Sequence, residues 1–195
     1  MHDEKPDIRG LEAEAYLQGG YFSIAQASVH RVSRQLLNHY VTHGRFERIG
    51  RGLYRINGFP RSDHDEMREK WMMLGQDNAV LSHESALALL ELSDNLADEV
   101  HLLVPRSRRG LRRLAGVVIH TRPDEEQVAT VWRDGLPLTA PARTLVDVAG
   151  KIQPDQAMMA IRQALERGLV TRSQLEHEAM QRRRPRLIAR LLPDR

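Results

Sequence analysis

The segment SHES, residues 82–85, contains the side-chain types of nucleophilic catalysis: a hydroxyl, an imidazole that can accept its proton, and a carboxylate that can orient the imidazole. An arginine and an aspartate in the later segment PARTLVD could join them in a polar cluster. A catalytic group needs side chains that converge on one point, whereas adjacent residues at a helix start point in different directions. We therefore interpret Ser82 as a helix cap and favour a non-enzymatic role, with catalysis left open. The candidate catalytic residues are Ser82, His83, Glu84, Ser85, Arg143 and Asp147.

Other enzyme and cofactor motifs are absent from the sequence. It contains no glycine-rich phosphate loop, no HExxH segment and no kinase-like set of lysine and DFG residues. Because the chain has no cysteine, disulfides, thiol catalysis and cysteine-ligated zinc are excluded, and a metal ion would need histidine and carboxylate ligands. We predict neither a metal site nor a cofactor.

Charge is distributed in blocks, so the net charge of +3 conceals most of the information. Residues 19–60 contain six arginines and one acidic residue, whereas residues 61–100 contain three basic and ten acidic residues. Basic character returns in residues 106–113, with five arginines, and in the C-terminal tail. Arginine favours forked contacts to phosphate or carboxylate, although a GC-rich coding sequence would produce the same bias. The first basic block therefore points to an acidic partner such as a nucleic acid.

The first sixty residues are expected to form three short helices followed by a two-stranded hairpin. A first helix is predicted over residues 9–18, and Ser23 begins a capping box that opens a second. Ser33 can cap a third helix, whose apolar residues form one stripe and which ends near Gly44. The segment FERIGRGLYRI, residues 46–56, is typical of a hairpin with a Gly-Arg-Gly tip and a bulged register.

This order of elements is that of a winged helix-turn-helix, in which the third helix enters the major groove and the hairpin lies along the adjacent backbone. Glutamine and asparagine on the third helix can pair with adenine and arginine with guanine, while Ser33 and the helix start suit a phosphate. Arg51 at the hairpin tip is expected to face phosphate or the minor groove. The alternative is a surface hairpin with solvated arginines and ordinary exposed helix residues. The predicted DNA-binding residues are Arg31, Ser33, Arg34, Gln35, Asn38, His39, Arg48, Arg51 and Tyr54.

The segment GFPRSD, residues 58–63, has the glycine, proline and polar residues of a linker. We place a winged helix-turn-helix domain at residues 1–58 and a second domain at residues 63–195. The second domain is expected to contain a small sheet, including the strands EVHLLVP and GVVIHTR, and several amphipathic helices. The predicted fold class is therefore α+β, a winged helix-turn-helix followed by a mixed α/β domain.

Between these two strands lies the arginine-rich segment RSRRGLRRLA. It can be a long basic hairpin loop exposed to solvent, a second DNA contact or a surface that meets an acidic partner. The candidate partner-binding residues are Arg106, Arg108, Arg109, Arg112 and Arg113.

The sequence has no sign of membrane insertion or export. No stretch approaches the roughly 18 apolar residues of a membrane span, and the charged start MHDEKPDIRG lacks the apolar centre of a signal peptide. The lack of cysteine agrees with a reducing compartment. A cytoplasmic location without membrane contact is expected.

Taken in order, several segments resemble the AbiEi antitoxins of bacterial type IV toxin-antitoxin systems. They are a winged-helix start ending in GRGLY, then VLSHESALALLELSD, VHLLVPRSRRGLRRLAGVVIHTR, GLPLTAPARTLVDVAG and ALERGLVTRSQLE. The resemblance extends over residues 20–178. One departure is the turn before the third helix, which reads SVHRVS without the glycine often found there.

The resemblance implies that the winged-helix domain binds inverted repeats of double-stranded DNA in the promoter of its own operon and represses transcription. It also implies that the C-terminal domain counteracts a cognate nucleotidyltransferase-like toxin, and it leaves direct binding of the toxin and enzymatic modification of the toxin as alternatives. By position, the DNA-facing elements are the helix over residues 33–43 and the wing over residues 48–54. The motifs SHESAL, residues 82–87, and PARTLVD, residues 141–147, receive no chemical role from the resemblance.

Overall fold

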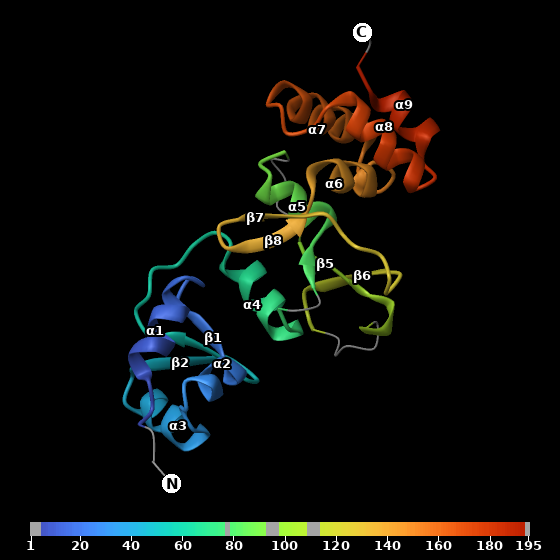
Figure 1. Ribbon diagram of the computed structural model, residues 1–195. Coiled ribbons are helices and arrows are strands. Elements are labelled where there is room, and N and C mark those ends of the chain that lie inside the picture. Colours follow the sequence, from blue (N-terminus) through green and yellow to red (C-terminus); the bar gives the residue numbers. More distant parts are fainter. Residues whose placement is uncertain (1–4, 77–78, 93–97, 109–113, 194–195) are drawn as a thin grey trace. The chain divides into compact units, whose positions relative to one another are not determined.

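The computed structural model describes residues 5–76, 79–92, 98–108 and 114–193 (Figure 1). By its internal contacts the chain forms two compact units, Met1–Gln76 and Asp77–Arg195. The fold class is α+β, as predicted, and the strands form two small sheets. None of the helices in the described ranges is long and apolar enough to cross a membrane.

The first unit has the element order of a winged helix-turn-helix (Figure 1, blue to green). Its three strands form an antiparallel sheet in the order β1-β3-β2, and β2 and β3 form the wing. The elements are α1 (Ile8–Tyr16), β1 (Tyr21–Ser23), α2 (Ile24–Val29), α3 (Arg34–Thr42), β2 (Phe46–Gly50), β3 (Leu53–Ile56) and α4 (Asp65–Leu74).

Local signals define the helix starts in this unit. The predicted capping box at α2 is present, because Ser23 Oγ accepts from the Gln26 backbone N–H at 3.2 Å while Gln26 Oε1 accepts from the Ser23 N–H at 2.8 Å. Ser33 caps α3, with its Oγ accepting from the Leu36 N–H at 3.2 Å. Gly44 ends the helix region with a φ of +73°, in the left-handed region that favours glycine.

An aromatic cluster holds the wing to the helices. The Phe22 ring lies 4.9 Å from that of Phe46 and 5.7 Å from that of Tyr54, and Leu37 of α3 is fully buried against them. Phe22 belongs to β1, a strand that the sequence analysis did not predict. The expected bulge is confirmed, because the register of β2 and β3 shifts between Arg48 and Gly50.

Helix α4 belongs to the first unit, whereas the composition of the sequence predicts it in the second domain. The Tyr21 hydroxyl on β1 donates to Glu69 Oε1 on α4 at 2.7 Å, and the Phe59 ring lies edge-on to Tyr16 at 5.2 Å. The segment predicted as a linker and the helix that follows it therefore belong to the first unit. The boundary between the two units lies after Gln76, later in the chain than the predicted boundary at residues 58–63.

The second unit contains a five-stranded sheet in the order β6-β5-β4-β8-β7. The pairs β5/β6 and β4/β8 are parallel, and the pairs β4/β5 and β7/β8 are antiparallel. The strands are β4 (Val80–Leu81), β5 (Val100–Pro105), β6 (Val117–Arg122), β7 (Thr130–Arg133) and β8 (Leu136–Thr139). The helices are α5 (His83–Leu89), the short 3-10 helix η1 (Arg106–Arg108), α6 (Pro141–Val148), α7 (Pro154–Glu166), α8 (Arg172–Gln181) and α9 (Pro185–Leu191).

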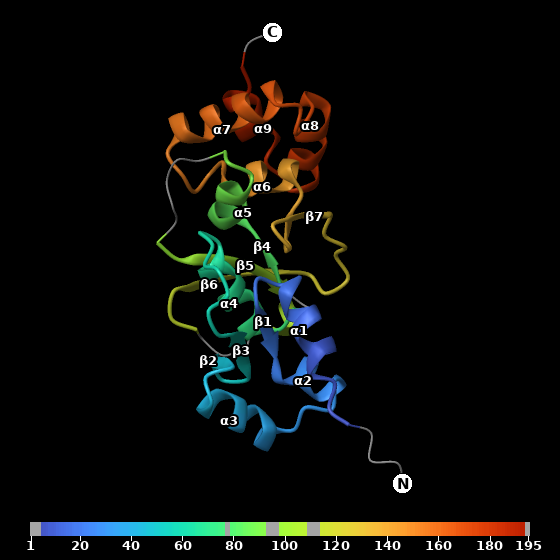
Figure 2. The same ribbon diagram turned by 90° about the vertical axis from the view of Figure 1, so that its left-hand side faces the viewer.

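Helix α5 packs on β5 and β8 of this sheet, and α6 packs on α5. Helices α6 to α9 gather into one helical group at the C-terminal end of the unit (Figure 2). The parallel pairing of β5 and β6 shows that the interpretation of residues 106–113 as a hairpin loop was wrong, since a hairpin joins antiparallel strands.

Candidate functional site

A hollow of about 410 Å³ lies between the third helix and the wing of the first unit. Two of its lining residues, Arg34 and Asn38, come from α3, and Arg48 and Arg51 come from the wing. The hollow therefore has three guanidinium groups and one amide around an open space. The lining residues are Ile24, Arg34, Asn38, Arg48, Arg51, Gly52 and Tyr54.

The local structure explains this convergence. Arg34 and Asn38 are four residues apart on α3 and so share one face of the helix. Gly52 turns the wing tip with a φ of +76°, which leaves Arg51 exposed beside it. Tyr54 is fixed from behind by stacking on Phe22, with 15° between the ring planes. The groove between α3 and the wing is thus built on the aromatic core.

Five of the nine predicted DNA-binding residues line the hollow, and four lie outside it. Ser33 uses its hydroxyl for the helix cap. Arg31 has a φ of +59° in the turn between α2 and α3. The His39 ring lies beside that of His43 with 4.0 Å between the centroids and 37° between the planes, and Gln35 is exposed on α3.

Arg55, the third arginine of the wing segment, faces the interior of the unit. It is 1% exposed, and its Nη2 donates to the Pro60 carbonyl at 2.8 Å and to Asp65 Oδ2 at 3.3 Å. Its guanidinium carbon lies 5.0 Å from the Tyr21 ring centroid and 5.8 Å from that of Phe59. Arg55 therefore has a structural role, which the charge count of the first sixty residues could not distinguish from an exposed one.

In the second unit, Arg143 and Asp147 converge in a closed ring of alternating charges, here called the charge ring. Arg143 Nε donates to Asp147 Oδ2 at 2.9 Å, and its Nη1 donates to Glu126. Arg182, the C-cap residue of α8, donates from its Nε to Asp147 Oδ1 at 2.7 Å and from its Nη1 to Glu126 Oε1 at 3.2 Å. Arg143 and Asp147 are each 5% exposed. The ring joins α6 to α8 and to the segment before β7.

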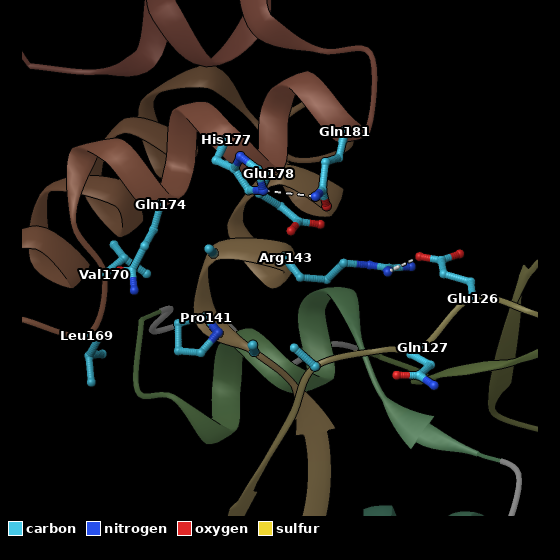
Figure 3. Close-up of a pocket in the computed structure, with 13 residues that line it drawn as sticks. Glu126, Gln127, Pro141, Arg143, Leu169, Val170, Gln174, His177, Glu178 and Gln181 are labelled. Atoms are coloured by element: carbon cyan, nitrogen blue, oxygen red, sulfur yellow. Dashed lines mark hydrogen bonds and ion pairs between the residues drawn. The ribbon is translucent and has the colours of Figure 1, made fainter.

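The arginines of the charge ring stabilise the charged form of Glu126. Burial acts to raise the pKa of Glu126, but hydrogen bonds and charges from Arg143 and Arg182 hold that pKa below its usual value. Beside the ring lies a hollow of about 340 Å³, toward which α8 presents His177 and Glu178 (Figure 3). The residues that line this hollow include apolar side chains and the amides of glutamines. The Arg143 side chain extends along it toward Glu126 (Figure 3).

The candidate residues of the SHES segment belong to a different group. His83 Nδ1 lies 3.0 Å from Ser82 Oγ, and Lys151 Nζ lies 3.0 Å from His83 Nε2 and 3.3 Å from His120 Nδ1. His120 Nε2 lies 3.2 Å from His101 Nδ1. The His83 and His120 rings are stacked, with 3.5 Å between their centroids. We call His83, His101 and His120 the histidine cluster.

The prediction that the Ser82 side chain caps the following helix is wrong. Ser82 occupies the N-cap position of α5, but its hydroxyl contacts His83 and makes no capping hydrogen bond. Ser85 is also engaged, because its Oγ accepts from the His101 backbone N–H at 2.8 Å. Ser82 is fully buried, so a substrate could not reach its hydroxyl. Ser82, His83 and Ser85 thus lie in or beside the histidine cluster, whereas Arg143 and Asp147 belong to the charge ring. Glu84 is half-buried on α5, and neither serine hydroxyl is open to solvent.

The histidine cluster is held uncharged by its surroundings. Burial, together with electrostatic interactions with His120 and Lys151, lowers the pKa of His83 to about 2. Burial and the Lys151 charge lower the pKa of His120 to about 4, and burial also lowers the pKa of His101. The three imidazoles are therefore neutral at pH 7. Sequence reasoning missed His101 and His120, whose only signal is their position on two neighbouring strands.

The candidate partner-binding arginines are only partly described. Arg106 and Arg108 lie on η1, and both are exposed. Ser107, between them, is fixed by its N–H and hydroxyl, each 2.9 Å from Asp124 Oδ1. Arg109, Arg112 and Arg113 lie outside the described residues.

A winged helix-turn-helix with an arginine-lined groove, followed by a separate α/β unit, defines a winged-helix transcriptional regulator with an additional domain. Residues 11–57 match the family model described as a transcriptional regulator, AbiEi antitoxin, and residues 78–192 match the AbiEi antitoxin C-terminal domain. The chain belongs to the AbiEi antitoxin family. Membership of this family gives the protein an antitoxin role and a role in transcriptional regulation, so its partners are a toxin and DNA.

The fold is also similar to a solved structure. The crystal structure of the RV2827C protein from Mycobacterium tuberculosis superimposes with a TM-score of 0.52 at 13% sequence identity. The similarity covers 88% of this chain and 70% of that one. A comparison with curated protein sequences finds no match.

Proposed function

We propose that this protein is an antitoxin that represses its own operon by binding inverted repeats in the promoter, and that it counteracts a cognate nucleotidyltransferase-like toxin. The observation that carries the DNA-binding half is the groove between α3 and the wing. A helix that presents Arg34 and Asn38 fits the major groove, where arginine pairs with guanine and asparagine with adenine. Arg48 and Arg51 would then follow the adjacent phosphates or the minor groove.

Of the nine predicted DNA-binding residues, we assign base contacts to Arg34 and Asn38. Gln35 and His39 are placed at the edge of the contact, because they lie outside the hollow. Arg31 and Ser33 at the start of α3 would approach the phosphates, and Tyr54 supports the wing from beneath.

The direct test is a titration of the full-length protein against a DNA fragment from upstream of its own gene, with a shuffled fragment of equal length as the competitor. The proposal expects tighter binding to the native fragment and a linear fall of log affinity with log salt concentration, because phosphate contacts release counterions. Equal affinity for both fragments would refute specific repression.

Variants in the groove should separate two kinds of contact. Asn38→Ala is expected to weaken binding to the native fragment by about 5- to 150-fold and to leave binding to shuffled DNA unchanged. Arg51→Ala should weaken binding to both fragments and lower the salt slope by about 1, because one phosphate contact is lost. Arg9→Ala removes an equal charge from the exposed face of α1, outside the groove, and is the matched control for Arg51→Ala. A loss as large with Arg9→Ala would show that only overall charge matters.

For the antitoxin half, we propose direct binding of the toxin through the basic segment that begins at η1. Arg106 and Arg108 project from η1 into solvent and so can meet an acidic surface without cost to the fold. The double substitution Arg106→Glu and Arg108→Glu should weaken co-purification with the toxin more than about tenfold, since like charges across an interface cost several kcal/mol.

The matched control reverses two exposed arginines on other helices, Arg162 of α7 and Arg186 of α9. Equal losses from both double variants would point to a nonspecific charge effect. Retained neutralisation of a toxin that never co-purifies would contradict direct binding, and a changed toxin mass would favour enzymatic modification.

A further inference from the structure

The histidine cluster of the second unit is assigned no role by the antitoxin and DNA-binding functions. Its three side chains come from three elements: His83 begins α5, His101 lies on β5 and His120 lies on β6. Each offers a ring nitrogen, and these atoms all lie within 4.8 Å of one another. We propose that His83, His101 and His120 form a binding site for a divalent transition-metal ion of the zinc type.

The sheet places two of the ligands. His120 pairs with Leu103 in the parallel register of β5 and β6, and His101 is two residues before Leu103. Side chains two residues apart on a strand point to the same face, so His101 and His120 share one face of the sheet. The third ligand follows β4, which pairs with β5, so His83 enters the same space from the start of α5.

Lys151 shows that the lone pairs of two rings already converge on one cation. Its Nζ lies 3.0 Å from His83 Nε2 and 3.3 Å from His120 Nδ1. An ammonium group can only donate hydrogen bonds, so both ring nitrogens accept and both are deprotonated there. A metal ion requires the same form of the imidazole. The ion would replace the ammonium, and Lys151 would swing out toward solvent, to which it is already exposed.

The opposite ring nitrogen of His83 is already held as a metal-binding histidine requires. Because Nε2 of His83 accepts, its Nδ1–H donates to Ser82 Oγ, a buried partner that fixes the ring. By the same reasoning the Nε2–H of His120 donates to His101 Nδ1. Coordination through that nitrogen of His101 breaks this bond, so His101 is the ligand that moves.

The required movement is small. Zinc–nitrogen bonds of about 2.0 to 2.1 Å in a tetrahedral site place ligand nitrogens roughly 3.4 Å apart. Because the ring nitrogens already lie within 4.8 Å of one another, each pair closes by about 1.4 Å at most, and the stacked rings rotate apart. His83 also has a φ of +50°, an unfavourable value for a residue with a side chain, and such strain concentrates at functional sites. Three neutral imidazoles favour zinc, copper or nickel over magnesium or calcium, which prefer oxygen ligands.

The test uses tag-free, full-length protein freed of metal with a chelator. Zn²⁺ is titrated by calorimetry, and Co²⁺ is followed by its visible absorption as an independent readout of the coordination geometry. We expect one equivalent of metal per chain, lost in His120→Gln, in which the substituted side chain is only partly buried. Ser82→Ala should weaken binding by about 10- to 100-fold, because it removes the orienting partner of His83. Lys151→Met should strengthen binding, since the competing cation is gone.

The chain offers a matched control for accidental binding. His39 of α3 and His43, the C-cap residue of that helix, lie one turn apart with ring centroids 4.0 Å apart, and a pair with that spacing can itself hold a metal ion. The double variant His39→Ala and His43→Ala should retain the bound equivalent. Loss of metal in that variant, or undiminished binding in His120→Gln, would overturn the proposal. So would the absence of binding by both the unmodified protein and Lys151→Met when each is shown to be folded by circular dichroism.

Discussion

The free energy of unfolding of the second unit is expected to fall by about 3 to 5 kcal/mol when Arg143 is replaced by methionine. Arg143 is buried and occupies one corner of the charge ring, where it donates to both carboxylates. Its removal leaves Asp147 and Glu126 with Arg182 as their shared cation. Methionine fills much of the volume, so the loss measures the uncompensated charge rather than a cavity. Hydrogen exchange of α6 peptides reports the second unit separately from the first.

The matched control is Arg172→Met on α8. Arg172 forms an ion pair with Glu176 at 3.1 Å with the same spacing of four residues as Arg143 and Asp147, but its side chain is 39% exposed and that of Glu176 is 56% exposed. Arg172 also donates to the Pro193 carbonyl at 3.0 Å, so the control variant loses that hydrogen bond as well. Exposed pairs contribute up to about 1 kcal/mol, so the control should lose far less. The double variant Arg143→Met and Asp147→Asn should lose less than the two single variants combined, because the partners share one interaction. Simple additivity, or equal losses for Arg143→Met and Arg172→Met, would contradict the structural role of the ring.

The charge ring also shows what the sequence could and could not predict. Arg143 and Asp147 are four residues apart on a predicted helix, so their pairing follows from helix geometry. Glu126 and Arg182 come from a loop and a later helix, and their convergence depends on tertiary packing for which no local pattern exists. The same holds for the histidine cluster, since His101 and His120 meet only because β5 and β6 are neighbours in the sheet.

The first unit was more predictable because its signals are local. The capping box at Ser23 and the cap at Ser33 define helix starts from side chains within three residues. Strand β1 was missed because three residues are too few for a period of two to be recognised. Strand β8 was missed for a related reason: all four of its residues are buried, so LPLT has no alternation, and Pro137 argues against a strand.

The domain boundary shows how composition can mislead. The glycine, proline and polar residues at 58–63 predict a linker, and the acidic residues after them predict the start of a new domain. The structure uses those acids inside the first unit, where Asp65 pairs with Arg55 and Glu69 accepts from Tyr21. A basic residue on the wing and an acidic residue on α4 are partners, so the opposite charges of two neighbouring blocks reflect contact rather than separate domains.

Because Arg55 is paired inside the first unit and Arg51 is exposed at the wing tip, substitutions of these two arginines should affect the stability of that unit differently. Arg55→Met is expected to lower the free energy of unfolding of the first unit by about 3 kcal/mol or more, because it leaves Asp65 buried without its main cation. It also removes the guanidinium from between the Tyr21 and Phe59 rings. Arg51→Ala, four residues earlier and exposed, should change stability by less than about 0.5 kcal/mol.

The two variants should show opposite patterns when stability and DNA binding are measured on the same samples. Arg55→Met should unfold at a lower denaturant concentration, yet bind the promoter fragment with near-normal affinity at temperatures where it remains folded. Arg51→Ala should keep its unfolding midpoint and lose affinity for DNA. If Arg55→Met weakened DNA binding while fully folded, or if Arg51→Ala were the less stable variant, the division of the wing into an inward and an outward arginine would be wrong. The two variants therefore test whether Arg55 stabilises the first unit while Arg51 binds DNA.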